Sequence, residues 1–85
     1  MKLTVIADDL LVIKDGEAYN VSDLSFLHSN VHAIQWYDTT GEIEYKDGSE
    51  NTTITDITPY NQCVTAWETA KQAYEDSISG YTSSS

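Results

Sequence analysis

The chain has 85 residues and a formal net charge of −10, because fourteen acidic residues oppose four lysines and arginine is absent. That charge repels nucleic-acid phosphates, and the usual reader of phosphate and guanine is missing, so we expect no direct binding of DNA or RNA. The lone Cys63 excludes a disulfide framework and a cysteine-based zinc site, and no apolar stretch is long enough to cross a membrane. We expect one small domain, and domains of this size often gain stability from a partner protein or from self-association as a homo-oligomer.

The N-terminal third predicts short strands joined by tight turns. Lys2–Ala7 and Leu10–Lys14 are apolar runs, and Asp15-Gly16 follows the second run at once. An Asp-Gly pair between two strand-like runs is a strong hairpin signal, so we expect the end of the second run to pair with Ala18–Asn20. Leu24–Leu27 is too short for its periodicity to separate a short strand from a helical turn, and both alternatives stay open.

The centre of the chain, Val31–Gly48, predicts a second hairpin around which the core forms. Its arms, Val31–Tyr37 and Gly41–Lys46, alternate apolar and polar residues, so one face of each arm is expected to be buried. Asp38–Gly41 joins the arms and has the chemistry of a turn. The residues expected on the buried face are His32, Ile34, Trp36, Ile43 and Tyr45.

The C-terminal part predicts one helix. Ser49–Thr53 is a polar loop that leads to a short extended piece near Ile54, and Thr58 and Pro59 have the chemistry of an N-cap and a first helical residue. Beyond them, apolar residues recur at spacings of three and four, which is the pattern of an amphipathic helix. This stripe consists of Tyr60, Cys63, Val64, Trp67, Ala70, Tyr74 and Ile78.

Together these elements predict the fold class. Short strands followed by a terminal helix are typical of the α+β class, here a small antiparallel β-sheet of hairpins followed by one C-terminal amphipathic helix. We expect the helix to span residues 59–79 with Gly80 as its C-cap, and residues 81–85 to form a flexible tail. Residues 1–80 then form a single β-rich domain, because no linker or repeat divides the chain.

Structural explanations account for the residues that could carry catalysis or bind a metal. Cys63 lies on the apolar stripe, where a buried thiol is expected, and His32 lies on an apolar strand face. Glu42 and Glu44 share a strand face that we expect to be solvated. The acidic turns lack the ligand spacing of a calcium loop. We therefore predict no catalytic residue, no cofactor and no metal site, and we expect that the chain is not an enzyme.

Aromatic residues are the candidates for contact with a partner. Six tyrosines and two tryptophans exceed what a core of this size can hold, and Tyr and Trp often anchor protein interfaces. Tyr37 falls on the strand face opposite Trp36, so it either covers the rim of the sheet or contacts a partner. The contact candidates are Trp36, Tyr37, Tyr45 and Tyr19.

Three segments in order resemble a known family. The strand Val31–Tyr37 contains HAIQW, Gly41–Gly48 reads GEIEYKDG, and the Asn- and Thr-rich stretch Asn51–Ile57 precedes a helix that contains Trp67. This order resembles small tailed-bacteriophage proteins, in particular the N-terminal β domain of tail-fibre assembly proteins, over about residues 2–76. The shared motifs are structural rather than catalytic, and the chain lacks the longer C-terminal helical extension of fuller members of that family.

The resemblance implies a protein-binding role. The chain would be a tail-fibre assembly factor or a fibre-associated virion subunit, with a phage tail or fibre protein as its partner, in the host cytoplasm or the virion tail. In assembly, a small β domain would cover apolar or edge-strand surface on an unfinished fibre. The acidity leaves an alternative, an acidic phage inhibitor of a host defence or nucleic-acid enzyme that acts by charge mimicry. Acidity that serves only solubility is a third explanation.

Overall fold

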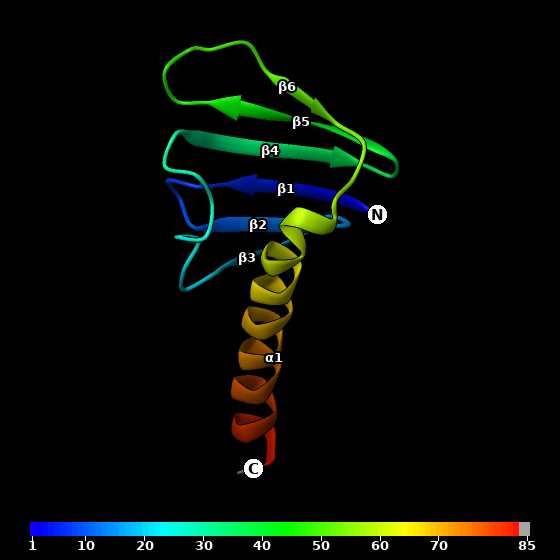
Figure 1. Cartoon of the computed structure of the whole chain (residues 1–85). Helices are drawn as coiled ribbons and strands as arrows, with labels where there is room; N and C mark the ends of the chain where they lie inside the picture. The colour runs from blue at the N-terminus through cyan, green and yellow to red at the C-terminus, as the bar shows by residue number, and fades with distance from the viewer. Residues whose placement is uncertain (84–85) are drawn as a thin grey trace.

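The structure, a computed structural model, describes residues 1–83, with side chains described as far as Ile78. It contains six strands, a short 3-10 turn and one long helix (Figure 1). The elements are β1 (Lys2–Ile6), β2 (Leu11–Lys14), β3 (Glu17–Asn20), β4 (Val31–Tyr37), β5 (Thr40–Tyr45), β6 (Thr52–Ile54), the 3-10 turn η1 (Thr58–Tyr60) and α1 (Asn61–Ser83). No helix within residues 1–83 combines the length and apolarity needed to cross a membrane.

All six strands form one antiparallel sheet in the order β3-β2-β1-β4-β5-β6. The predicted α+β class, an antiparallel sheet of hairpins followed by one C-terminal helix, is therefore confirmed. The first predicted hairpin is present, with Ile13 opposite Ala18 and Val12 opposite Tyr19. Its second arm begins at Glu17, opposite Lys14, one residue before the predicted Ala18–Asn20. Its two turn residues, Asp15 and Gly16, both have positive φ (50° and 88°). Positive φ at both positions is typical of the two-residue turn whose twist matches that of the flanking strands.

The predicted turn Asp38–Gly41 is shorter than expected. Tyr37 and Thr40 are already register partners, so only Asp38 and Thr39 connect β4 to β5. Gly41 is a buried strand residue instead, and a Cβ atom on it would lie 2.9 Å from Cε3 of Trp36. Glycine is thus required at this position by the close approach of an indole ring and not by a turn.

The expectation that His32 lies on the buried face with Ile34 and Trp36 is wrong. The side chain of His32 is 48% exposed, whereas Val31 next to it is buried. The register between β4 and β5 shifts between Val31 and Ala33. Such a bulge moves the side chains before it to the opposite faces of the sheet, which a strict alternation cannot anticipate.

Between β3 and β4, the ambiguous segment Leu24–Leu27 forms neither a strand nor a helix. The N–H of Leu27 donates to the carbonyl of Leu24 at 3.0 Å, and Asp23 Oδ1 accepts the N–H of Ser25 at 2.9 Å. These bonds make a compact turn that places Leu24 in the core with only 6% exposure. The loop therefore covers one end of the sheet.

The entry into the helix differs from the prediction at its cap. Thr58 and Pro59 open a 3-10 turn whose N-cap position is occupied by Ile57 and not by Thr58, and the N-cap residue makes no side-chain capping bond. The carboxylate of Asp56 accepts the N–H of Thr58 at 2.9 Å instead. An aspartate two residues upstream thus satisfies a free amide at the start of the helical segment.

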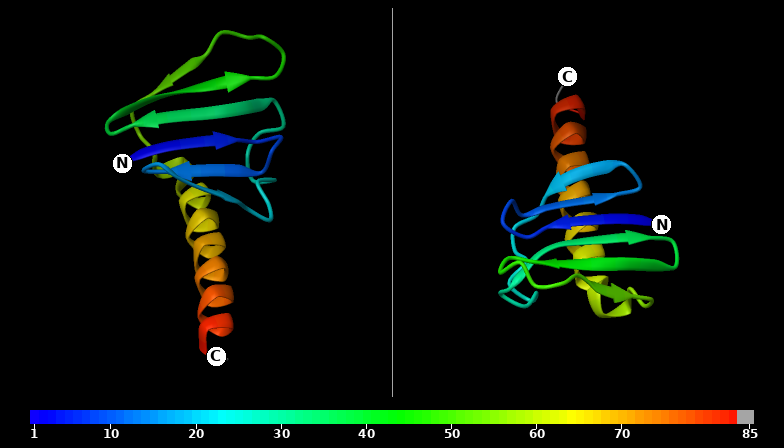
Figure 2. Two further views of the ribbon diagram at one scale, coloured as in Figure 1. Left: turned by 180° about the vertical axis from the view of Figure 1, so that it is seen from behind. Right: turned by 90° about the horizontal axis from the view of Figure 1, so that it is seen from above.

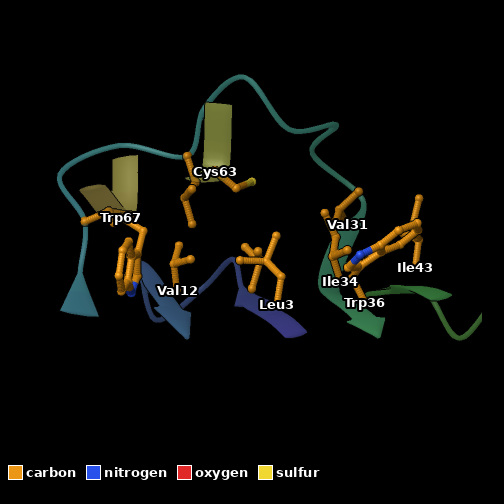
Figure 3. Close-up of a cluster of buried hydrophobic side chains, with 11 residues drawn as sticks. Leu3, Val12, Val31, Ile34, Trp36, Ile43, Cys63 and Trp67 are labelled. Atoms are coloured by element: carbon orange, nitrogen blue, oxygen red, sulfur yellow. The ribbon is translucent and has the colours of Figure 1, made fainter. Parts of the chain in front are cut away.

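The core lies between the sheet and the first half of α1. Figure 3 shows Trp67 and Cys63 directed toward Val12 and Leu3, with Trp36 and Ile43 at the other end of the cluster. The helix contacts the sheet chiefly through β2 and β3. The fully buried part of the predicted stripe is therefore its N-terminal part.

The second half of α1 extends beyond the sheet past β3, which makes the molecule 53 Å long (Figure 1). Along this part the predicted stripe is exposed, with Tyr74 at 55% and Ile78 at 46%. The helix continues through Gly80 to Ser83, so the prediction of a C-cap at Gly80 and a tail from residue 81 is wrong. The last two residues of that predicted tail, 84–85, lie outside the described part of the chain.

Candidate functional site

Strands β1 and β2 carry apolar side chains on both of their faces. Val5 and Val12 point toward the helix and are fully buried, whereas Ile6, Leu11 and Ile13 point the other way and are partly exposed. Strands that are apolar on both faces are typical of sheets that are covered on both sides. In residues 1–83 only the helix side is covered, and Figure 2 (left) shows the other side of the sheet without any segment over it.

The rest of that uncovered side is polar. Thr4, Gln35, Glu42 and Thr53 are successive register partners on β1, β4, β5 and β6, so they form one row across the sheet. Gln35 Nε2 donates a hydrogen bond to Glu44 Oε2 at 3.1 Å beside this row. We call the whole surface, the apolar patch on β1 and β2 together with this polar row, the open face.

Tyr37 stands at the rim of the open face, at the end of β4. Its side chain is 64% exposed, which is the highest value among the large apolar side chains of the described residues. A shallow hollow adjoins its ring on the β1–β4–β5 part of the sheet. The side chains around this hollow include Lys2, Thr4, Gln35, Thr40, Glu42 and Thr53. The combination gives a partner an apolar ring to contact and, beside it, a recess bordered by hydroxyl, amide and carboxylate groups.

Two interactions of the N-terminal residues hold this rim in place. The Met1 amino group lies 2.8 Å from Asp38 Oδ1, and this hydrogen bond raises the pKa of the amino group. Asp15 Oδ1 accepts the N–H of Lys2 at 2.9 Å, and this hydrogen bond lowers the pKa of the Asp15 carboxyl group. Both turns that flank the start of β1 are thus tied to it, and Lys2 is kept opposite Tyr37.

Only one of the four predicted contact residues reaches the open face. Trp36 is 5% exposed and belongs to the core, so its ring presents almost no surface to a partner. Tyr45 packs against the core and its hydroxyl lies 2.6 Å from Thr52 Oγ1. Tyr19 packs edge-on against Trp67 on the helix side, with ring centroids 5.7 Å apart. Tyr37 alone has the outward orientation that its strand position predicted.

The apolar residues of the open face were missed at the sequence level. The signal for them was present, because Leu10–Lys14 contains an unbroken apolar run instead of an alternation. A run of this kind indicates that both faces of a strand are to be covered, by the rest of the chain or by another protein. The run predicts a strand, but it does not by itself indicate what covers the second face of that strand.

Comparisons of the chain with protein-family models, with curated proteins and with solved structures found no match. The chemistry of the open face therefore has to be inferred from its own residues. These are an exposed tyrosine, a partly exposed aliphatic patch and a row of hydroxyl, amide and carboxylate groups. They can bind a protein surface by apolar contact and by hydrogen bonds at the rim.

The reactive side chains lie elsewhere and have local explanations. Cys63 is fully buried on the side of α1 that faces the core, and burial raises the pKa of its thiol to about 11. His32 Nδ1 lies 3.8 Å from Asp8 Oδ2, and Lys46 Nζ lies 2.8 Å from the other oxygen of that carboxylate. Within residues 1–83, no three or more His, Cys, Asp and Glu side chains gather as metal ligands do.

Proposed function

We propose that this chain is a protein-binding module that catalyses no reaction and that receives its partner on the open face. The observation that carries this proposal is the 64% exposure of Tyr37 beside the uncovered apolar patch of Ile6, Leu11 and Ile13. Tyrosine buries a large ring at low entropic cost, and it is among the residues enriched at interface hot spots. A partner that covered the patch would give β1 and β2 the second covering layer that their sequence suits.

The specific form of this proposal is a tail-fibre assembly factor or a fibre-associated virion subunit of a tailed bacteriophage, acting in the host cytoplasm or in the virion tail. Its support is the resemblance over about residues 2–76 together with the open face. Fibre chains are repetitive and rich in strands, so their unfinished forms expose apolar surface and unpaired edges. A sheet with an apolar patch on its open face would cover such surface until the fibre is assembled.

Removal of the Tyr37 side chain tests the assignment of the open face. We expect Tyr37→Ala to lower the recovery of the partner from phage-infected cells about 30-fold, because a hot-spot aromatic contributes on the order of 2 kcal/mol. Tyr37 packs against little in the free protein, so circular dichroism and the melting temperature should stay at the wild-type values. The readout is quantitative mass spectrometry of proteins that are captured with the tagged chain.

A second exposed aromatic residue provides the matched control. Phe26 is 40% exposed and belongs to the loop between β3 and β4, not to a strand of the open face. Phe26→Ala should therefore capture the same proteins as the wild type. Equal recovery by Tyr37→Ala and the wild type would remove Tyr37 from the binding site.

One observation favours the alternative of an acidic inhibitor that mimics nucleic-acid charge. Three of the four lysines lie within 4 Å of a carboxylate of the same chain, at Lys14, Lys46 and Lys71. Each of these lysines is neutralised by its own carboxylate, so the electrostatic potential at a distance comes from the remaining acidic residues. Binding of this kind weakens steeply with salt, whereas apolar contact on the open face does not.

A further inference from the structure

Strand β3 ends the sheet with backbone groups that point away from it. The N–H of Val21, just past β3, donates to the carbonyl of Leu10 at 2.8 Å. Residues that bond to the same neighbour alternate along an antiparallel strand, so Glu17, Tyr19 and Val21 face β2. Ala18 and Asn20 therefore direct their backbone N–H and C=O groups outward, and no strand in residues 1–83 lies on that outer side of β3.

The helix continues over the space that lies beyond this edge. The ring of Tyr74 lies 5.8 Å from that of Tyr19, which places Tyr74 at the edge of the sheet. The helix residues after it, 75–83, extend about 13 Å further at about 1.5 Å per residue. That length equals nearly three strand spacings of about 4.8 Å each. The helix is thus long enough to cover strands that this chain does not supply.

Two hollows mark this region. The first follows the outer edge of β3 beneath the helix and is lined by all four β3 residues and Tyr74. The second lies between the helix and the end of β3, where small residues leave room along the helix. The residues that line the second hollow are Asn20, Ser22, Ala66, Thr69, Ala70 and Ala73.

We propose that a second copy of this chain fills both hollows, with the two β3 strands paired antiparallel about a two-fold axis at Tyr19. Ala18 then pairs with Asn20 of the second copy and Asn20 with its Ala18, which satisfies the outward backbone groups of both edges. The sheet becomes continuous across the two copies. The end of each helix passes over the other sheet and enters the second hollow of that copy.

The geometry favours a second copy over an extended segment of a different protein. A single added strand would fill the first hollow but would leave most of the helix overhang and the second hollow without contact. A second copy related by a two-fold axis fills both hollows, since each chain supplies a protruding helix end and also the hollow that receives the helix end of the other copy. The register also separates the two Glu17 residues, and Lys71 Nζ lies 3.4 Å from Glu17 Oε2 and offsets its charge.

Sedimentation velocity over a concentration series tests this dimer. We expect the wild type to reach twice the 9.5 kDa mass of one chain. Ala18→Pro removes an outward N–H that β2 does not use, so it should raise the dissociation constant about 50-fold. Thr53→Pro, in the middle of the opposite edge strand β6, is the matched control and should leave the dimer intact.

A second pair of variants covers the case in which the proline variant fails to fold. Ala73 and Thr65 are both exposed on α1, but only Ala73 lines the second hollow. Ala73→Glu should therefore weaken the dimer and Thr65→Glu should not, while both keep the wild-type circular dichroism spectrum. A wild type that stays at 9.5 kDa at every concentration would overturn the proposal, as would a dimer that both Ala18→Pro and Ala73→Glu leave unchanged.

This dimer is independent of the proposed function. It uses the edge of β3 and the far half of α1, whereas the partner is assigned to the open face around Tyr37. Ala18→Pro should lose the dimer and keep partner capture, whereas Tyr37→Ala should lose partner capture and keep the dimer. These two results distinguish failure of the dimer proposal from failure of the proposed function.

Discussion

Replacement of Trp67 by alanine is expected to lower the free energy of unfolding by about 3–5 kcal/mol. Trp67 is 6% exposed, and its Nε1 donates to the carbonyl of Glu17 at 2.9 Å. Lys14 Nζ and Lys71 Nζ lie over its ring, at 4.8 Å and 5.1 Å from the centroid. The residue thus joins the helix to β2 and β3, the strands on which the helix rests.

The loss expected for Trp67→Ala is large relative to the total free energy of unfolding. A domain of this length has a stability of about 4–13 kcal/mol at about 0.05–0.15 kcal/mol per residue, so Trp67→Ala brings it close to unfolding. Urea denaturation followed by circular dichroism gives the measurement. Trp67→Phe keeps a ring but loses the bond to Glu17, so we expect a smaller loss, of about 1–3 kcal/mol. Stability changes below about 1 kcal/mol for Trp67→Ala would contradict the packing described for α1.

Gly41→Ala is the second substitution with a large expected effect. The added Cβ would lie 2.5 Å from the carbonyl oxygen of Gln35 and 2.9 Å from Cε3 of Trp36. One of these atoms is backbone of the central strand β4 and the other belongs to a buried indole ring, so neither can move freely. We expect a loss of about 1–3 kcal/mol, as for other insertions into packed cores.

Urea denaturation also measures this loss. With a slope of about 1 kcal/mol per molar for a protein of this size, the midpoint should fall by about 1–3 M. Glu42→Ala changes the adjacent residue, which is exposed on the open face, and should leave the midpoint nearly unchanged. If both variants unfolded at the wild-type midpoint, Gly41 would not lie against Trp36 as described.

The sequence predicted the elements with strong local signals. Asp15-Gly16 stands between two apolar runs and forms a two-residue turn in the structure, because both positions need positive φ. The spacing from Tyr60 to Ile78 predicted the helix, since a stripe at three and four residues is visible without tertiary information. The central hairpin was predicted from alternation for the same reason.

The features that were missed depend on contacts between distant residues. Gly41 has the composition of a turn residue, and only the approach of Trp36 explains it. The exposure of His32 follows from a bulge that strand alternation does not encode. Tyr74 continues the same periodic stripe as Trp67, and periodicity alone cannot show where the sheet beneath the helix ends.

Strand position predicted the orientation of Tyr37 and Trp36, whereas their role in binding stays a prediction. Alternation placed Tyr37 and Trp36 on opposite faces, and the structure confirms that separation. Trp36 was nevertheless chosen as a contact residue because tryptophan is common in interfaces, although its face is the buried one. Residue type therefore predicted less about the surface than strand position did.

The most direct test of the protein-binding proposal is the capture of partners by the tagged wild-type chain from phage-infected cells, with washes at low and at high salt. We expect a phage tail or fibre protein that stays bound at high salt, because contact on an apolar face is not screened by ions. Recovery of a host nuclease or nucleic-acid-binding protein that high salt removes would contradict this account and would support charge mimicry instead.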